Sequence, residues 1–218
     1  MDKHRHILVV LPHPDDECHS MSGSLAKFIS EGVPVTYACL TLGQMARNMG
    51  RPLFANRITL PGIRKLELLE SCRSIGITDL RLLGFHDKMV EFEKDEDVEA
   101  PILALIEELK PSLIMTFYPG YSVHPDHDAT GAAVVRAVAK LPVDERPEVH
   151  GVAFSKGCED ILGKPDVVRD VRAFVKQKIG SIQAHRSQWQ LDLGKKTAND
   201  REVQERFGTE RFWTYRFG

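Results

Sequence analysis

Short apolar runs alternate with longer amphipathic stretches along this chain. The runs at 7–11 (ILVVL) and 113–117 (LIMTF) are apolar almost throughout, which is typical of strands buried on both faces of a parallel sheet. Amphipathic stretches of helical length lie between such runs. The predicted strands are 7–11, 34–40, 80–83, 112–117 and 148–154, and the predicted helices are 21–31, 60–75, 97–109, 127–140 and 168–182.

This alternation predicts the fold class. Strands separated by helices need crossover connections, and these produce a largely parallel sheet covered on both faces. We therefore expect an α/β protein with a Rossmann-like, doubly wound sheet. A chain of 218 residues is long enough for one domain with a substantial core, so we expect a single domain over 1–218. Residues 42–52 and the chain after about residue 183 lack clear periodicity, and no element is predicted there.

Composition narrows the class of protein. Hydrophobic residues make up 42% and charged residues 28%, as in ordinary globular proteins. Neither a membrane span nor a signal peptide is apparent, so we expect a cytoplasmic protein that contacts no membrane. The formal net charge is −2, and no stretch concentrates Lys and Arg, which favours a small-molecule substrate over nucleic acid. A homo-oligomer is compatible with this composition.

Histidines and carboxylates directly follow two of the predicted strands. The segment 12–17 (PHPDDE) follows the strand at 7–11, and the segment 124–127 (HPDH) comes soon after the strand at 112–117. Ligands of α/β proteins bind at the carboxyl ends of the strands, and parallel strands end at the same edge of their sheet. The two segments are therefore expected to form one site.

The residue types in these segments suit a divalent metal. Imidazole nitrogen and carboxylate oxygen are ligands that Zn²⁺ prefers, and a catalytic site uses three protein ligands and an open position. His13, Asp16 and His127 are the candidate ligands, one ion per chain, and Fe²⁺ or Mn²⁺ would also fit such a site. Asp15, next to a ligand, is the candidate general base.

Other interpretations of the same residues remain open. Asp15 and Asp16 precede a helical stretch, where aspartate often caps a helix N-terminus. Glu17 is predicted either to support a ligand histidine or to stabilise the first helical turn. A nucleotide-binding module is disfavoured because no G-x-G-x-x-G follows the first strand. A metal-binding protein without catalysis is the other alternative, which the open coordination position disfavours.

Taken together, the motifs resemble those of the LmbE/PIG-L family of zinc-dependent deacetylases. PHPDDE and HPDH match the signature pair of the family, residues 64–67 (RKLE) resemble its R-x-x-E element, and residues 185–188 (HRSQ) resemble its H-x-S-Q element. The match covers most of the chain. It implies a zinc-dependent amide hydrolase that removes an acetyl group from an amino-sugar conjugate.

The resemblance also implies roles for individual residues. It gives His13, Asp16 and His127 as zinc ligands and Asp15 as the general base, in agreement with the spacing. It gives His124 as a second catalytic group whose imidazolium would stabilise the oxyanion.

Roles outside the ligand set follow from the same resemblance. It gives Asp126 as a residue that orients a ligand histidine. Arg64 is expected at the site, although an exposed Arg64–Glu67 pair on one helix is the alternative. Independently of the resemblance, Trp189 is expected to fill core or a subunit contact rather than to stack on a sugar, as tryptophans more often do.

More narrowly, residues 41–50, 83–87 and 212–215 resemble the deacetylases of bacillithiol biosynthesis, which act on N-acetylglucosaminyl-malate. An arginine binds carboxylates in a bidentate geometry, so Arg47 in the loop at 43–52 is a candidate for contact with malate. The alternative substrates are other N-acetylated sugars or thiol conjugates, such as a chitooligosaccharide or a mycothiol-type precursor.

Overall fold

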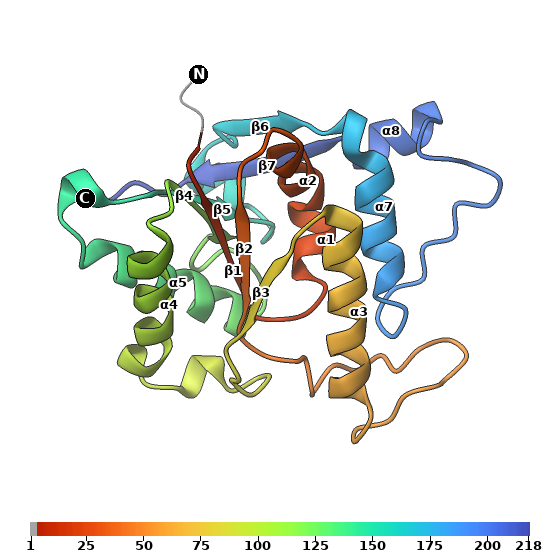
Figure 1. Cartoon of the computed structure of the whole chain (residues 1–218), viewed down its shortest axis with the longest axis horizontal. Helices are drawn as coiled ribbons and strands as arrows, with labels where there is room; N and C mark the ends of the chain where they lie inside the picture. Colours follow the sequence, from red (N-terminus) through yellow and green to blue (C-terminus); the bar gives the residue numbers. More distant parts are fainter. Residues whose placement is uncertain (1–3) are drawn as a thin grey trace.

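The computed structural model describes residues 4–218, and in this range seven strands form one sheet with helices on both faces (Figure 1). The strands are β1 (Ile7–Leu11), β2 (Val35–Cys39), β3 (Asp79–Leu82), β4 (Leu113–Phe117), β5 (Glu148–Val152), β6 (Val167–Asp170) and β7 (Thr209–Thr214). The α-helices are α1 (Asp16–Ser20), α2 (Ser22–Ser30), α3 (Leu60–Ile75), α4 (Asp95–Leu109), α5 (Pro125–Ala139), α6 (Cys158–Leu162), α7 (Val175–Ala184) and α8 (Arg201–Phe207). None of these helices is long and apolar enough to cross a membrane. The predicted α/β fold class is confirmed.

The strand order is β3-β2-β1-β4-β5-β7-β6. The first five strands in this order are parallel, whereas β7 runs antiparallel to β5 and to β6. The chain builds outward from β1 to β2 and β3 on one side and then returns to β4 on the other. A crevice forms outside the carboxyl ends of the strands at such a switch point. The motifs that follow β1 and β4 therefore meet there.

The core lies on both faces of the sheet, and β1 separates its two halves. All five residues of β1 are fully buried. Ile7, Val9 and Leu11 pack into the cluster below α2 and α3, whereas Leu8 and Val10 pack into the cluster below α4 and α5. Figure 1 shows these two helix groups on opposite sides of the sheet. Since successive side chains of a strand point to opposite faces, the apolar run satisfies both clusters.

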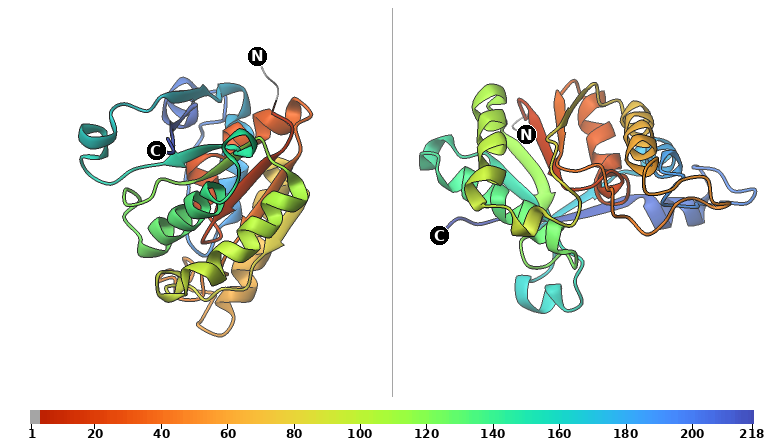
Figure 2. Two further views of the ribbon diagram at one scale, coloured as in Figure 1. Left: turned by 90° about the vertical axis from the view of Figure 1, so that its left-hand side faces the viewer. Right: turned by 90° about the horizontal axis from the view of Figure 1, so that it is seen from below.

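The predicted helix at 168–182 is wrong in its first half. Residues 167–170 form β6, and the α-helix begins only at Val175. The β-branched Val167 and Val168 suit a strand, and β6 pairs with β7, which lies about forty residues later in the chain. The sequence also gave no signal for α8 or for β7, which enters the sheet between β5 and β6. Figure 2 shows this late part of the chain beside the parallel strands.

The C-terminal strand also holds the beginning of α2. The Glu210 side chain of β7 is buried and accepts hydrogen bonds from the backbone amides of Gly23 (2.9 Å) and Ser24 (2.7 Å). The first amides of a helix have no partner within the helix, so Glu210 caps α2 from a distance. Lys178 of α7 donates to the same carboxylate at 2.6 Å. One buried ion pair thus connects β7, α2 and α7.

Replacing Glu210 by alanine is predicted to destabilise the fold. The Glu210→Ala variant leaves the Lys178 ammonium and two helix amides buried without their acceptor, which costs about 3–5 kcal/mol. Urea denaturation followed by far-UV circular dichroism measures this loss. The matched control is Glu202→Ala, which removes an exposed pair with Lys196 and costs about 0–1 kcal/mol. Equal losses in the two variants would contradict the capping role.

Candidate metal centre

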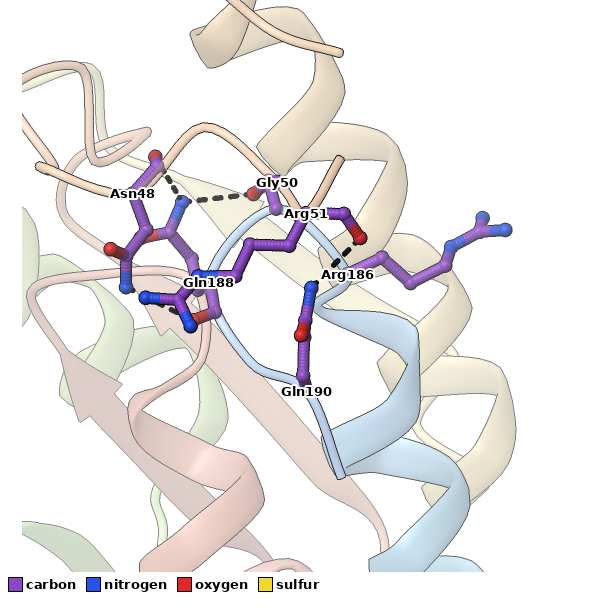
Figure 3. Close-up of a pocket in the computed structure, with 7 residues that line it drawn as sticks. Asn48, Gly50, Arg51, Arg186, Gln188 and Gln190 are labelled. Atoms are coloured by element: carbon purple, nitrogen blue, oxygen red, sulfur yellow. Dashed lines mark hydrogen bonds between the residues drawn. The ribbon is translucent and has the colours of Figure 1, made fainter. Parts of the chain in front are cut away.

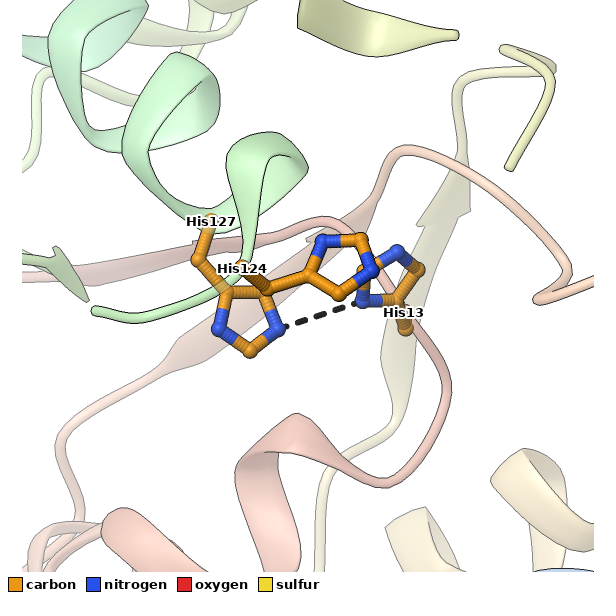
Figure 4. Close-up of side chains that lie close together, drawn as sticks. All are labelled: His13, His124 and His127. Carbon is orange, nitrogen blue, oxygen red and sulfur yellow. Dashed lines mark hydrogen bonds between the residues drawn. The ribbon is translucent and has the colours of Figure 1, made fainter. Parts of the chain in front are cut away.

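The three predicted ligands converge at the carboxyl ends of β1 and β4. His13 Nδ1 lies 3.3 Å from His127 Nε2 (Figure 4), and the Asp16 carboxylate lies 3.4 Å from the former and 3.2 Å from the latter. Ligand atoms about 2.0–2.2 Å from a tetrahedral zinc ion are roughly 3.3–3.6 Å apart. The donor set, two imidazole nitrogens and a carboxylate oxygen, therefore fits one divalent ion.

The charges around these ligands also suit a cation. Burial by itself raises the pKa of Asp16, but His127 and His13 hold it well below its usual value, so the carboxylate is ionised. Burial opposes the charge of His13, whereas Asp16 and two further carboxylates raise its pKa well above the usual value. In this arrangement the positive charge of protonated imidazole balances the negative charge of the carboxylates. A divalent ion would take over that balance as these protons leave.

His127 is held by groups that leave its Nε2 atom to face the other ligands. The ring stacks on Phe117 of β4, with centroids 4.0 Å apart and planes 9° from parallel. Its Nδ1 atom lies 3.1 Å from the carbonyl oxygen of Ser122, which accepts the Nδ1 proton. Such a bond to the second ring nitrogen fixes the tautomer of a metal-ligating histidine.

His13 is fixed in the same manner by two aspartates. Its Nε2 atom lies 3.2 Å from both Asp126 Oδ2 and Asp87 Oδ1. Backbone amides hold the two carboxylates, because Lys88 donates to Asp126 and Met45 donates to Asp87, both at 2.7 Å. Asp126 thus lies where it would orient His13.

Asp87 is a site residue for which the sequence analysis gave no role. It follows β3, and the carboxyl ends of parallel strands meet at one edge of the sheet. Its position after the predicted strand at 80–83 was the available signal, but no second histidine or carboxylate at ligand spacing accompanies Asp87 as in the segments after β1 and β4.

His124 is placed to donate a hydrogen bond into the site. Its ring centroid lies 4.8 Å from that of His13. The Asp126 amide donates to His124 Nδ1 at 3.1 Å, which caps α5 and leaves the ring proton on Nε2. Burial, together with His13 and His127, lowers the pKa of His124. This geometry suits donation from Nε2, and the imidazolium role of His124 stays a prediction.

Asp15 is held in an unusual backbone conformation beside the ligands. Its φ angle is 104°, a left-handed value that costs energy for a residue with a Cβ atom. Arg64 donates to Oδ1 at 2.8 Å, and the Trp189 indole donates to Oδ2 at 2.9 Å. Burial raises the pKa of Asp15, against the opposing charge of Arg64. Asp15 occupies the N-cap position of α1, yet its side chain makes no capping bond, so capping does not explain it.

Arg64 is part of the site and not of an exposed pair with Glu67. Both side chains are buried, and the Arg64 guanidinium also donates to the carbonyl oxygens of Pro14 and Gly43. Glu67 instead accepts from the amide and the hydroxyl of Ser187 at 2.7 and 2.6 Å. The interpretation as a surface ion pair is therefore wrong.

Glu17 supports the site through Asp15 and not through a ligand histidine. Its carboxylate accepts from the Asp15 amide at 3.1 Å and from the Ser71 hydroxyl at 2.5 Å, and it pairs with His185 at 2.7 Å. Burial opposes the charge of His185, but Glu17 raises the pKa of that imidazole. This fully buried pair connects the end of α7 to the turn that carries Asp15.

Two loops border the site and line an open cavity of about 240 Å³ between them, and none of the candidate ligands lines this cavity. The loop at 43–52 and the segment at 185–190 are joined by hydrogen bonds, among them Gly50 N to Ser187 O at 2.9 Å. Figure 3 shows the residues that line the cavity, with Arg186 pointing away from the others. Arg47 is exposed on the first loop and is not among the lining residues.

The match to a family profile agrees with this geometry. The profile of PIG-L, described as GlcNAc-PI de-N-acetylase, matches residues 8–138, which span β1 to α5. This chain belongs to the PIG-L family. The matched range contains all the candidate ligands and Asp15, whereas the supporting residues His185 and Trp189 lie beyond it.

Relatives within the PIG-L family match almost the whole chain. A Bacillus cereus protein named probable N-acetyl-alpha-D-glucosaminyl L-malate deacetylase 2 is 51% identical over 217 residues, covering 98% of this chain and 99% of its own. A Bacillus subtilis protein of the same name is 46% identical and covers 97% and 98%. The 1D-myo-inositol 2-acetamido-2-deoxy-alpha-D-glucopyranoside deacetylase of Acidothermus cellulolyticus is 29% identical and covers 94% of this chain and 87% of its own.

Solved structures share the PIG-L fold at low sequence identity. N,N'-diacetylchitobiose deacetylase from Pyrococcus horikoshii has a TM-score of 0.72 and 22% identity, covering 97% of this chain and 84% of its own. The Pseudomonas putida protein GalB, a 4-carboxy-2-hydroxymuconate hydratase, has a TM-score of 0.71 and 16% identity, covering 93% and 82%. Because proteins of different named activity share the fold, the reaction has to be argued from the site.

Removing the Asp126 carboxylate is predicted to weaken metal binding. In Asp126→Asn, His13 loses the charged acceptor that orients it, and such losses cost about 10- to 100-fold in metal affinity. Competition with a chromophoric zinc chelator measures the dissociation constant of the protein. The control is Asp97→Asn, an exposed position in the first turn of α4. Equal affinities in the two variants would refute the orienting role.

Proposed function

We propose that this protein is a zinc-dependent deacetylase that converts N-acetylglucosaminyl-malate to glucosaminyl-malate and acetate in bacillithiol biosynthesis. The observation that carries this proposal is the convergence of His13, Asp16 and His127 beside Asp15, in a chain 51% identical to the Bacillus cereus relative along nearly its whole length. The donor set of two imidazoles and one carboxylate favours Zn²⁺ over harder ions.

Asp15 acts as the general base in this proposal. A zinc ion bound by the three ligands lowers the pKa of water and polarises the amide carbonyl. Arg64 and Trp189 each occupy one lone pair of the Asp15 carboxylate, which leaves further lone pairs to accept a proton from the attacking water. The raised pKa of Asp15 suits a group that takes this proton and returns it to the leaving nitrogen.

His124 stabilises the charge that develops on the amide oxygen. Its Nε2–H group donates as a neutral imidazole, because the Asp126 amide occupies Nδ1. A donor that is already oriented before the reaction stabilises an oxyanion without a reorganisation cost. The helix α5 that carries His127 begins directly after His124, so the donor and a ligand are fixed by the same element.

The loop at 43–52 supplies the groups that recognise malate in this proposal. Arg51 lines the cavity between them, and Arg47 lies on the same loop. A guanidinium binds a carboxylate in a bidentate geometry. Malate has two carboxylates. Both remain free when malate is joined to the sugar as a glycoside, and one remains free when it is joined as an ester. We assign Arg47 and Arg51 to this end of the substrate.

The central test compares two substrates and two variants. Zinc-loaded protein is incubated with N-acetylglucosaminyl-malate and with N-acetylglucosamine, and the released amine is quantified. The malate conjugate is expected to react faster. Asp15→Asn is expected to keep its zinc but lose about 10²–10⁴-fold in kcat, the usual contribution of a general base. His127→Ala is expected to lose both zinc and activity.

The outcomes separate the parts of the proposal. Equal turnover of the two sugars would refute malate recognition and favour another N-acetylated substrate. A near-normal rate for Asp15→Asn would refute the assignment of the base. Bound zinc without release of amine from either sugar would refute the deacetylase function.

Adding a Cβ atom at Gly43 is predicted to disturb Asp15 indirectly. A Cβ atom there would lie 1.6 Å from Arg64 Nη1, so the guanidinium has to move away from Asp15. Loss of a hydrogen bond to a charged group costs about 1.5–3 kcal/mol, so we expect kcat of Gly43→Ala to fall about 10- to 100-fold with zinc content unchanged. Steady-state kinetics and metal analysis measure the two quantities.

Gly194→Ala is the matched control for this prediction. Gly194 has a similar left-handed φ angle, 57° against 62° at Gly43, but a Cβ atom there would meet nothing within 4 Å. The control therefore carries the same backbone strain without the steric contact. If both variants lose activity equally, backbone strain and not the displacement of Arg64 is responsible.

A further inference from the structure

Trp189 and Trp213 are the only two tryptophans of the chain, and they differ in how they are placed. Trp213 is buried, and its indole nitrogen donates to the carbonyl oxygen of Gly163 at 2.9 Å. Trp189 is 44% exposed, and its polar edge points inward to Asp15 Oδ2. A ring placed for packing alone buries its apolar face, so the placement of Trp189 needs another explanation.

The backbone around Trp189 is built to hold this orientation. The Trp189 amide donates to the carbonyl oxygen of His185 at 2.8 Å, directly after α7 ends. The His185 side chain is in turn buried against Glu17, which accepts from the Asp15 amide. The position of the indole is thus set by the same pair that holds the backbone of Asp15.

Contacts on either side of Trp189 fix the segment further. Gln188 Nε2 donates to Asn48 O at 3.0 Å, and Gln190 Nε2 donates to Arg51 O at 2.8 Å. The ring itself meets His19 of α1 edge-on, with centroids 4.3 Å apart. Both neighbours of Trp189 are therefore tied to the opposite loop, which fixes the backbone from which the indole extends to Asp15.

The Asp15 carboxylate needs such a partner. Arg64 binds Oδ1, but χ2 of an aspartate is a broad torsion, so one hydrogen bond fixes the plane of the carboxylate only loosely. A donor on Oδ2 removes that freedom. The Asp15 side chain is 15% exposed, so water competes for this oxygen if the indole is absent.

We propose that Trp189 is a positioning residue for Asp15, acting through its indole N–H group to fix the carboxylate for proton transfer. This inference rests on the proposed role of Asp15 as the base. A misplaced catalytic group lowers the rate of the chemical step more than the binding of substrate. The phenylalanine variant keeps an aromatic ring and removes only the donor and part of the ring.

The kinetic test compares Trp189→Phe with Lys195→Ala, an exposed position that follows the segment at 185–190. We expect kcat of Trp189→Phe to fall about 10- to 100-fold, as for one lost hydrogen bond to a charged group. KM and zinc content are expected to stay near those of the wild type, because the bond acts on the base and not on the substrate. Lys195→Ala is expected to behave as the wild type. A Trp189→Phe kcat within about twofold of wild type, or a loss seen mainly in KM, would overturn the proposal.

A fluorescence test examines the contact without any substrate. Replacing Asp15 by alanine removes the acceptor, and the indole then turns to water. Asp15→Ala is expected to shift the emission maximum to longer wavelength in the wild-type background. No shift is expected in the Trp189→Phe background, where only the buried Trp213 emits. The absence of a shift in the wild-type background would overturn the proposed contact.

The two tests also separate this proposal from the proposed function. If the wild-type protein releases no amine from the sugar conjugates while the emission shifts as expected, the deacetylase function fails and the Trp189–Asp15 contact stands. If the wild type is active, Asp15→Asn is inactive and Trp189→Phe is unimpaired, the function stands and the positioning role fails.

Discussion

The parallel pairing of β1 with β4 is the contact on which the site depends. His13 and His127 are 114 residues apart in the sequence and are brought within 3.3 Å because these two strands end side by side. Every residue of β1 is buried on one face or the other, so a shift in register would move its side chains into the wrong clusters. The hydrophobic core thus sets the distance between the ligands.

Residues after α5 support site residues that lie earlier in the chain. All candidate ligands and Asp15 lie between β1 and α5, in the range that matches the PIG-L profile. The residues after α5 hold these groups in place, because Glu210 caps α2 and His185 pairs with Glu17. The matched range also contains Asp87 and Asp126, which contact His13. The segment beyond it supports Asp15, through the His185–Glu17 pair and through Trp189.

The charges of the site form one balanced group. Two aspartates flank His13 at Nε2, and Asp16 faces it at Nδ1. Such an excess of acid at a buried point is stable only with compensating positive charge. A divalent cation brings two positive charges to one point. Its binding is coupled to release of the imidazole protons. This explains why so many carboxylates gather where the fold excludes most water.

The sequence by itself determined the fold class, the two strand-end motifs and the residues His13, Asp16 and His127, because an apolar run and the residues directly after it are local features. The tertiary structure alone decided the positions of β6 and β7, since each needs a strand partner from a distant part of the chain. It alone decided the contacts of Asp87 and Trp189 as well. The resemblance of residues 83–87 gave Asp87 no role, and Trp189 lies outside every predicted element. Each reaches the site only because packing brings separate loops together.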